Sequence, residues 1–251
     1  MLLGLVLPLL ALFAMTFTAG ETPFSGKFMA LIGNSVWVAS AAALVCAAAA
    51  LWLAYAERLY PQRLVRGGVR VATLGYAVPG LVLAVALMLP MTSFDKWIAT
   101  ALRDVLDIRW GLLLTGTSAA LIFVYVARFL TVAFNSTQAG LIQIHPQLDA
   151  AARSLGHSPG SVLRRVHLPL LRPAILTGLL LVFIDVMKEL PATLILRPFN
   201  FETLATWVYR YASDERLAEA STAALAIVLV SLVPTVMLSL CLLYTSDAAD
   251  D

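Results

Sequence analysis

The sequence has little charge for its length. Only 13% of its 251 residues are charged, whereas soluble domains have roughly a quarter. In contrast, 61% are hydrophobic, and the mean hydropathy is +0.88. This balance excludes an ordinary soluble domain and indicates an integral membrane protein. The net charge of +2 and the lack of any basic tract give no indication of nucleic-acid binding.

Signatures of a bound nucleotide and of a zinc protease are also missing. The sequence has no GxxxxGK(S/T) phosphate loop and no HExxH. Cys46 and Cys241 stand singly in apolar runs without CxxC spacing, which is typical of small buried hydrophobic residues. The histidines His145, His157 and His167 match no zinc spacing. We therefore expect no metal site and no directly bound cofactor.

Long apolar runs dominate the chain instead. A helix of about 20 mostly apolar residues crosses the hydrocarbon core, and its backbone polar groups are satisfied internally. We therefore expect an all-α, polytopic membrane bundle of about six transmembrane helices. The first run lacks a preceding basic region, which favours a span over a secretory signal. The expected spans are approximately 2–19, 28–56, 69–89, 112–134, 174–196 and 218–244.

Prolines inside an apolar run can kink or break a helix. Pro79, followed by Gly80, and Pro191 lie inside apolar runs, and each proline removes a backbone donor. Such breaks line pathways in some bundles, and in others they are bends that neighbouring helices stabilise. The sequence leaves both interpretations open.

A polar, basic stretch separates the fourth and fifth spans. Pro146 suits the first turn of a helix, since that position needs no backbone donor. Leu148, Ala151, Ala152 and Leu155 follow at i, i+3, i+4 and i+7. This spacing predicts a helix with a narrow face of small and apolar residues.

A turn and a second short helix are expected next. Gly156 suits a left-handed helix stop, and Ser158 suits a cap before Pro159 in the first turn. We expect Pro169 to break the chain before Pro173 opens the fifth span. The face of such a hairpin could rest on lipid or dock into a groove on a partner, and three consecutive alanines favour docking.

The spacing of this stretch resembles the EAA loop of binding-protein-dependent ABC importer permeases. The matching positions are Ala151, Ala152, Gly156 and the run VHLP at 166–169. The family's glutamate falls at Ala150, with Asp149 one residue earlier as the candidate acidic contact. The resemblance implies a cytoplasmic coupling loop, about 135–173, that seats on an ATPase. Its implied coupling residues are Leu148, Asp149, Ala151, Ala152, Leu155, Gly156 and Pro169.

The resemblance covers almost the whole chain. It implies a type I ABC importer permease fold, a single six-helix domain over 1–243, and a multi-pass location in the bacterial inner membrane. Residues 185–225 are similar to the C-terminal half of ferric iron permeases, which fuse two six-helix units. The chain is therefore expected to be part of a fused permease. The tail YTSDAADD, 244–251, is expected to be disordered or artefactual, similar to translated adapter sequence.

Charged residues inside the fifth span form a second candidate site. Asp185, Lys188 and Glu189 fall at i, i+3 and i+4, and an ionised side chain at mid-bilayer costs about 3 kcal/mol. Asp185 and Lys188 could form a structural ion pair. The remaining acid and the nearby Pro191 favour a wet translocation path, without tight metal ligation because a path must release its cargo.

The resemblance implies a transporter subunit and not an enzyme. A separate ABC ATPase dimer would hydrolyse ATP, a periplasmic binding protein would deliver cargo, and a second six-helix half, fused or separate, would complete the pore. Ferric iron is the leading cargo, followed by thiamine, sulfate, polyamine and phosphonate. Two further functional classes are an intramembrane enzyme using Asp185 and Glu189, and a passive channel.

Overall fold

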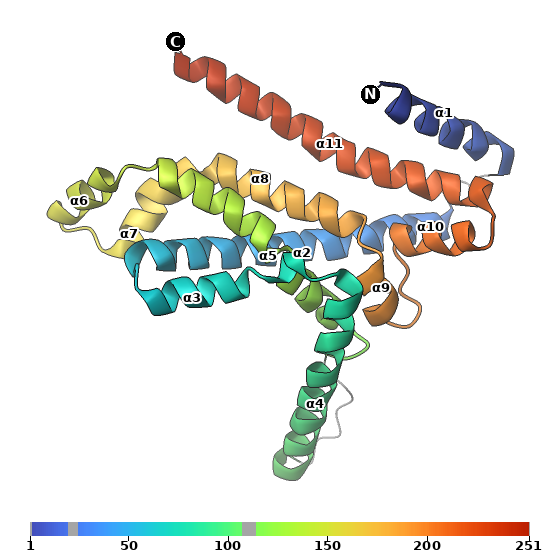
Figure 1. The fold of residues 1–251 in the computed structure, drawn as a ribbon, viewed down its shortest axis with the longest axis horizontal. Coiled ribbons are helices and arrows are strands. Elements are labelled where there is room, and N and C mark those ends of the chain that lie inside the picture. The colour runs from blue at the N-terminus through green and yellow to red at the C-terminus, as the bar shows by residue number, and fades with distance from the viewer. Residues whose placement is uncertain (1, 20–24, 107–113, 251) are drawn as a thin grey trace. The chain divides into compact units, whose positions relative to one another are not determined.

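The structure is a computed structural model, and it describes residues 2–19, 25–106 and 114–250. Within these residues the regular elements are helices and no strand occurs (Figure 1). The helices are α1 (Leu2–Ala19), α2 (Gly26–Leu59), α3 (Arg63–Ala72), α4 (Gly80–Leu106), α5 (Ser118–Gln143), α6 (Pro146–Ser154), α7 (Pro159–Val162), α8 (Leu168–Met187), α9 (Pro191–Leu196), α10 (Leu204–Ser213) and α11 (Leu217–Asp250).

Five helical stretches are long and apolar enough to cross a membrane. They are Gly26–Leu59, Gly80–Asp104, Ser118–Gln143, Pro159–Met187 and Leu217–Val236. A shorter apolar helix, Val6–Thr18, lies within α1. The expected all-α membrane bundle is thereby confirmed.

The predicted position of the third span, 69–89, is wrong, because the membrane-length stretch in this region is Gly80–Asp104. Helix α3 ends at Ala72, a 3₁₀ turn covers Gly75–Ala77, and α4 begins at Gly80 directly after Pro79. Apolar composition runs across this break, so hydropathy alone placed the span too early. The buried carboxylate of Asp95 in α4 accepts backbone N–H bonds from Leu114 (2.9 Å) and Thr115 (2.7 Å).

The expected fifth span, 174–196, is likewise divided. Helix α8 ends at Met187 and α9 starts at Pro191, which occupies the first helical turn. Pro169, in contrast, does not break the chain as expected. A π-helical turn at Leu163–His167 precedes it, in which the Leu168 N–H donates to Leu163 O. This wider turn joins α7 to α8, and the helical backbone continues although Pro169 has no backbone N–H to donate.

The described chain divides into two compact units, with boundaries within α2, α5, α8 and α11 and between Ala77 and Val78 ahead of α4. Unit 1 comprises Met1–Ala42, Val78–Tyr125 and Phe183–Pro234, and unit 2 comprises Ala43–Ala77, Val126–Val182 and Thr235–Asp251. The single-domain boundary at residue 243 remains a prediction. Helix α11 extends through Asp250, and a disordered or artefactual tail over 244–251 remains a prediction.

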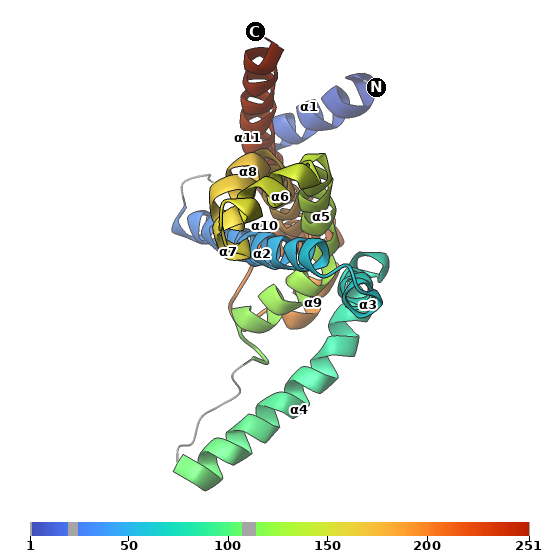
Figure 2. The same ribbon diagram turned by 90° about the vertical axis from the view of Figure 1, so that its left-hand side faces the viewer.

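Small residues bring helices together in unit 2. A Cβ at Gly178 of α8 would lie 3.2 Å from the Ala133 Cα of α5, and one at Gly140 would lie 2.6 Å from the Ala174 Cβ. The Ser136 hydroxyl donates to Ala174 O at 2.7 Å. Close backbone approach with an interhelical hydroxyl bond is typical of membrane bundles. Figure 1 shows α6 and α7 at one end of the α5–α8 pair, and Figure 2 shows the same elements viewed from that side.

Candidate functional site

The helix–turn–helix in the polar stretch has the local features that its sequence predicts. The His145 side chain caps α6 by accepting from Gln147 N–H, and Pro146 opens the helix. Gly156 has φ +81°, and the Ser158 hydroxyl accepts from Ser161 N–H ahead of α7. These capping groups and the left-handed glycine define the two helices and the turn between them.

The predicted apolar face of this hairpin is mostly exposed. Leu148 and Ala151 are exposed, and Leu155 is 78% exposed at the tip. Ala152, in contrast, is buried. The face therefore offers two leucines and an alanine for a partner, while Ala152 holds α6 in place. Pro169, the last predicted coupling residue, is exposed in the first turn of α8.

The carboxylate of Asp149 points inward, away from this face. Its Oδ2 lies 2.9 Å from Arg58 Nε and 2.8 Å from Arg58 Nη2, and its side chain is 18% exposed. The same guanidinium donates through Nη1 to Leu141 O (2.6 Å) and through Nη2 to Ile144 O (2.9 Å). Arg58 of α2 thus caps the end of α5 and fixes the first turn of α6 together.

Tyr55 of α2 and His167 form a second set of contacts, which connects α2 to the α7 side of the hairpin. His167 is buried, and its Nε2 lies 2.6 Å from Asp149 Oδ1, although the two groups are not aligned for a hydrogen bond. Its ring packs edge-on against Tyr55 at 5.5 Å, and the Tyr55 hydroxyl donates to Pro159 O at 2.6 Å. We call Tyr55, Arg58, Asp149 and His167 the inner clamp.

The inner clamp shows how Asp149 and His167 are held within unit 2. Asp149 is expected to offer an acidic contact to a partner, but the structure engages its carboxylate with Arg58 and His167. His167, which matches no zinc spacing in the sequence, is buried beside Asp149. Sequence reasoning missed Arg58 and Tyr55, since each lies far along the chain from its partner. The available signal was an arginine and a tyrosine at the polar end of a long apolar run.

The charged residues at the end of α8 do not share one helical face. Lys188 Nζ pairs with Asp185 Oδ1 at 2.9 Å, and the lysine side chain is 64% exposed. Glu189 lies beyond the end of α8, and its buried Oε1 accepts from Ala192 N–H at 3.2 Å, which caps α9 beside Pro191. Each acid thus has a structural partner, an arrangement that gives no support to an acid/base pair.

A cationic pocket in unit 1 was not predicted from the sequence. It has a volume of about 720 Å³ and lies among α2, α9, the following loop and α10. Its charged lining residues are Lys27, Arg197, Glu202 and Arg210. Nothing in the sequence indicates that these residues lie together, because Lys27 is far along the chain from the other three.

Residues 47–244 match the family described as binding-protein-dependent transport system inner membrane component. The chain is 31% identical over 212 residues to the Fe(3+)-transport system permease protein FbpB 2 of Haemophilus influenzae, covering 84% of this chain and 39% of that protein. It is 35% identical over 118 residues to the putative 2-aminoethylphosphonate transport system permease protein PhnV of Salmonella typhimurium, covering 47% of this chain and 43% of that one. The chain therefore spans less than half the length of these relatives.

Two solved structures have a similar fold. One is a bacterial alginate ABC transporter in complex with an alginate pentasaccharide-bound periplasmic protein, with a TM-score of 0.73, 17% identity, and coverage of 93% of this chain and 86% of that one. The other shows inward-facing conformations of the MetNI methionine ABC transporter, with a TM-score of 0.59, 17% identity, and coverage of 86% and 96%. At these identities the likeness shows the type I importer permease fold alone.

Proposed function

The chain belongs to the family of binding-protein-dependent transport system inner membrane components, and we propose that it acts as a permease subunit of an ATP-driven importer. The observation that carries this proposal is the exposed face of Leu148, Ala151 and Leu155 on a hairpin fixed to α2. An exposed apolar helix face suits a groove on a partner protein.

The inner clamp gives this hairpin a mechanical role. Arg58 joins α2 to the end of α5 and the start of α6, and Tyr55 joins α2 to the start of α7. A partner that displaces the hairpin would therefore displace the end of α2 with it. Because the sequence has no GxxxxGK(S/T) loop, the partner that supplies this motion is a separate ABC ATPase dimer.

The proposed coupling residues divide into two groups by their burial. Leu148, Ala151, Leu155 and Pro169 are exposed and would contact the ATPase, and Gly156 shapes the turn between the two helices. Asp149 and Ala152 would position α6 from within. The division refines the set that the EAA-loop resemblance implies.

We propose ferric iron as the cargo, because a relative that matches 84% of this chain is named as an Fe(3+)-transport permease. A phosphonate is the second candidate, since a putative 2-aminoethylphosphonate permease is 35% identical over a shorter stretch. Thiamine, sulfate and polyamine have no such observation in their favour.

Cargo delivery and passage need further components. We propose a periplasmic binding protein as the donor and a second six-helix half, fused or separate, to complete the pore for alternating access. The break between α8 and α9 is proposed to border the path, with Asp185, Lys188, Glu189 and Pro191 shaping it. In support, Lys188 and Leu190 line a cavity of about 340 Å³ together with Tyr209.

The docking proposal is tested by Leu155→Glu. A carboxylate on the exposed tip should abolish co-purification of the ATPase and leave the stability of the permease unchanged, since Leu155 has few internal contacts to lose. Leu64→Glu is the matched control, because Leu64 on α3 is also highly exposed in unit 2. Equal co-purification for both variants would rule out the assigned docking face.

The cargo proposal needs a separate assay. Cells that lack their own importer and express the complete system should take up radiolabelled ferric iron in an ATP-dependent manner. Uptake of 2-aminoethylphosphonate, with no uptake of iron, would replace the first cargo by the second. Leu155→Glu should abolish either uptake, which links the cargo assay to the docking face.

A further inference from the structure

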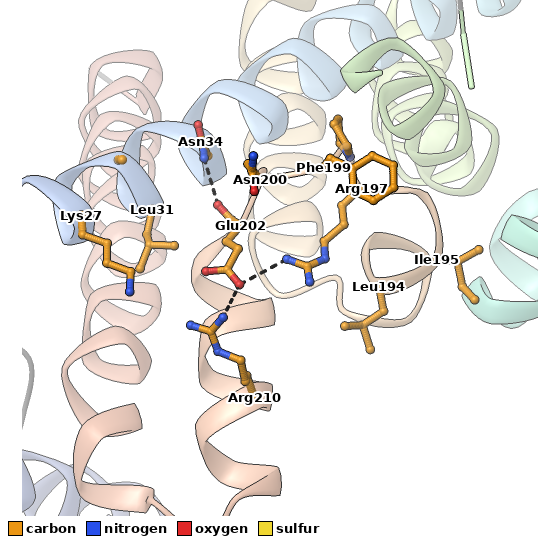
Figure 3. Close-up of a pocket in the computed structure, with 12 residues that line it drawn as sticks. Lys27, Leu31, Asn34, Leu194, Ile195, Arg197, Phe199, Asn200, Glu202 and Arg210 are labelled. Atoms are coloured by element: carbon orange, nitrogen blue, oxygen red, sulfur yellow. Dashed lines mark hydrogen bonds and ion pairs between the residues drawn. The ribbon is translucent and has the colours of Figure 1, made fainter. Parts of the chain in front are cut away.

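The pocket in unit 1 carries an excess of positive charge. Three cationic side chains and one carboxylate line it, namely Lys27, Arg197, Arg210 and Glu202. Figure 3 shows Glu202 between the two arginines, with Lys27 reaching toward the same space from α2. The lining has a formal charge of +2, obtained from three cations and one anion.

The loop that supplies this charge is fixed to α2. The Asn34 amide Nδ2 donates to Glu202 O at 3.0 Å, and the Ser35 hydroxyl accepts from Leu204 N–H at 2.8 Å. Thr203 and Thr206 form a reciprocal capping box at the start of α10. The loop backbone is therefore held on both sides of Glu202, which preorganises the charged side chains.

Glu202 orients the two arginines without neutralising them. Its Oε1 accepts from Arg210 Nη1 at 2.6 Å and lies 3.4 Å from Arg197 Nη1. A guanidinium has five N–H donors, and one carboxylate oxygen engages only one donor of each arginine in these contacts. The carboxylate thus brings two positive charges together and leaves donor capacity for another anion.

Trp207 supplies a rigid base beneath the cations. The ring is fully buried, with Lys27 Nζ 4.4 Å and Arg210 Cζ 4.3 Å from its centroid. Cation–π contacts of this kind favour the positions of both side chains. The lysine and the arginine are therefore held at the pocket and not left to extend freely into solvent.

We propose that this pocket binds an oxyanion, meaning a phosphate, phosphonate or carboxylate group, through Lys27, Arg197 and Arg210. Planar guanidinium groups match the oxygen geometry of these anions, and the ammonium of Lys27 adds a third charged donor. A bare trivalent cation would be repelled by the same lining. The inference goes beyond the proposed importer function, because binding here does not depend on transport.

Equilibrium dialysis with radiolabelled inorganic phosphate tests the site on the full chain in an uncharged detergent. Wild-type protein should bind phosphate saturably, and Arg197→Gln and Lys27→Gln should each weaken binding about tenfold, since each removes a charge-assisted hydrogen bond. Arg216→Gln is the matched control, because this exposed arginine of unit 1 pairs with Glu219 outside the pocket. It should bind as the wild type does.

Two results would overturn the proposal. One is the absence of saturable phosphate binding to the wild-type protein, and the other is unchanged binding by both pocket variants. Thermal unfolding of each variant checks that weakened binding does not reflect a lost fold. Because no ATPase or cargo is present, failure here leaves the importer proposal standing, and failure of uptake leaves this site standing.

A lipid arm of the same experiment identifies the source of the oxyanion. Phosphatidylglycerol or phosphatidylcholine is added to the dialysis cell at equal concentration. Displacement of phosphate by phosphatidylglycerol alone, lost in Arg197→Gln, would identify a lipid headgroup. Retained phosphate binding in both lipids would identify a soluble solute. Either result supports the site, whereas equal displacement from wild type and variant by both lipids would contradict it.

Discussion

The inner clamp of unit 2 and the cationic pocket of unit 1 use arginine in opposite ways. Arg58 is 15% exposed and directs Nε, Nη1 and Nη2 to Asp149 and two backbone carbonyls. Arg197 and Arg210 are more exposed and share a single oxygen of Glu202. The first arrangement fixes helices to one another, whereas the second presents charge to a ligand.

The difference has an energetic consequence. Removing one partner of a buried ion pair leaves the other charge desolvated and unpaired, which costs about 3–5 kcal/mol, whereas exposed pairs contribute about 0–1 kcal/mol. Substitutions in the clamp should therefore lower stability. Substitutions in the pocket should lower ligand binding with little change in stability.

Arg58→Met should have the largest effect. It removes the partner of Asp149 and the donors to Leu141 O and Ile144 O, so we expect the free energy of unfolding to fall by about 3 kcal/mol. Denaturant unfolding in detergent measures this. Arg66→Met is the control, since Arg66 is 55% exposed and its Nε lies 3.9 Å from Glu57. Equal losses in the two variants would contradict the clamp.

Gly156→Val should have the next largest effect. The valine would have to adopt φ near +81°, at a cost of about 1–2 kcal/mol, or the turn between α6 and α7 would change. We expect loss of ATPase co-purification with normal membrane insertion. Gly160→Val is the matched control, because Gly160 has open space and no positive φ. Normal co-purification of Gly156→Val would contradict the assigned role of this turn.

Glu189→Ala should have a moderate effect. It removes the acceptor for Ala192 N–H at the start of α9, and a lost helix cap costs about 1 kcal/mol. Glu189→Gln keeps an acceptor oxygen and should retain most of the stability, as measured by thermal unfolding. If Glu189→Gln retains stability but lowers cargo uptake, then the negative charge of Glu189 contributes to transport, in addition to the role of the side chain as a helix cap.

Lys188→Gln should have the smallest effect on stability. Its pair with Asp185 is on the exposed side, with the lysine side chain 64% exposed, so we expect a change below about 0.5 kcal/mol. The same unfolding assay measures it. A loss above about 1 kcal/mol would show that this pair resembles the clamp and not an exposed ion pair.

Local features of the hairpin could be predicted from the sequence, and distant pairings could not. The starts at Pro146 and Pro159 and the turn at Gly156 depend on residues within a few positions, so spacing was sufficient. Arg58 and Asp149 are 91 residues apart, and no local pattern relates them. The pocket could not be predicted for the same reason, because it brings Lys27 together with residues beyond 190.

The boundaries of the third and fifth spans were predicted wrongly, because the sequence pattern does not show where a helix ends. Hydropathy reports how apolar a segment is and not where its backbone hydrogen bonds stop, so the run across Pro79 read as one span although α4 begins at Gly80. Pro169 gave the opposite error: a break was predicted there, but the helical backbone continues through it. A π-helical turn accommodates it, and such turns have no simple sequence signature.

The most direct test of the account compares Ala152 in α6 with Leu155, the residue that directly follows α6. A photo-crosslinking amino acid is placed at Leu155, which is 78% exposed, or at Ala152, which is buried, in the membrane of the native cell. We predict a cross-link from Leu155 to a protein with a GxxxxGK(S/T) phosphate loop and none from Ala152. Absence of that product at Leu155, or equal products at both positions, would contradict the docking of this face to an ATPase.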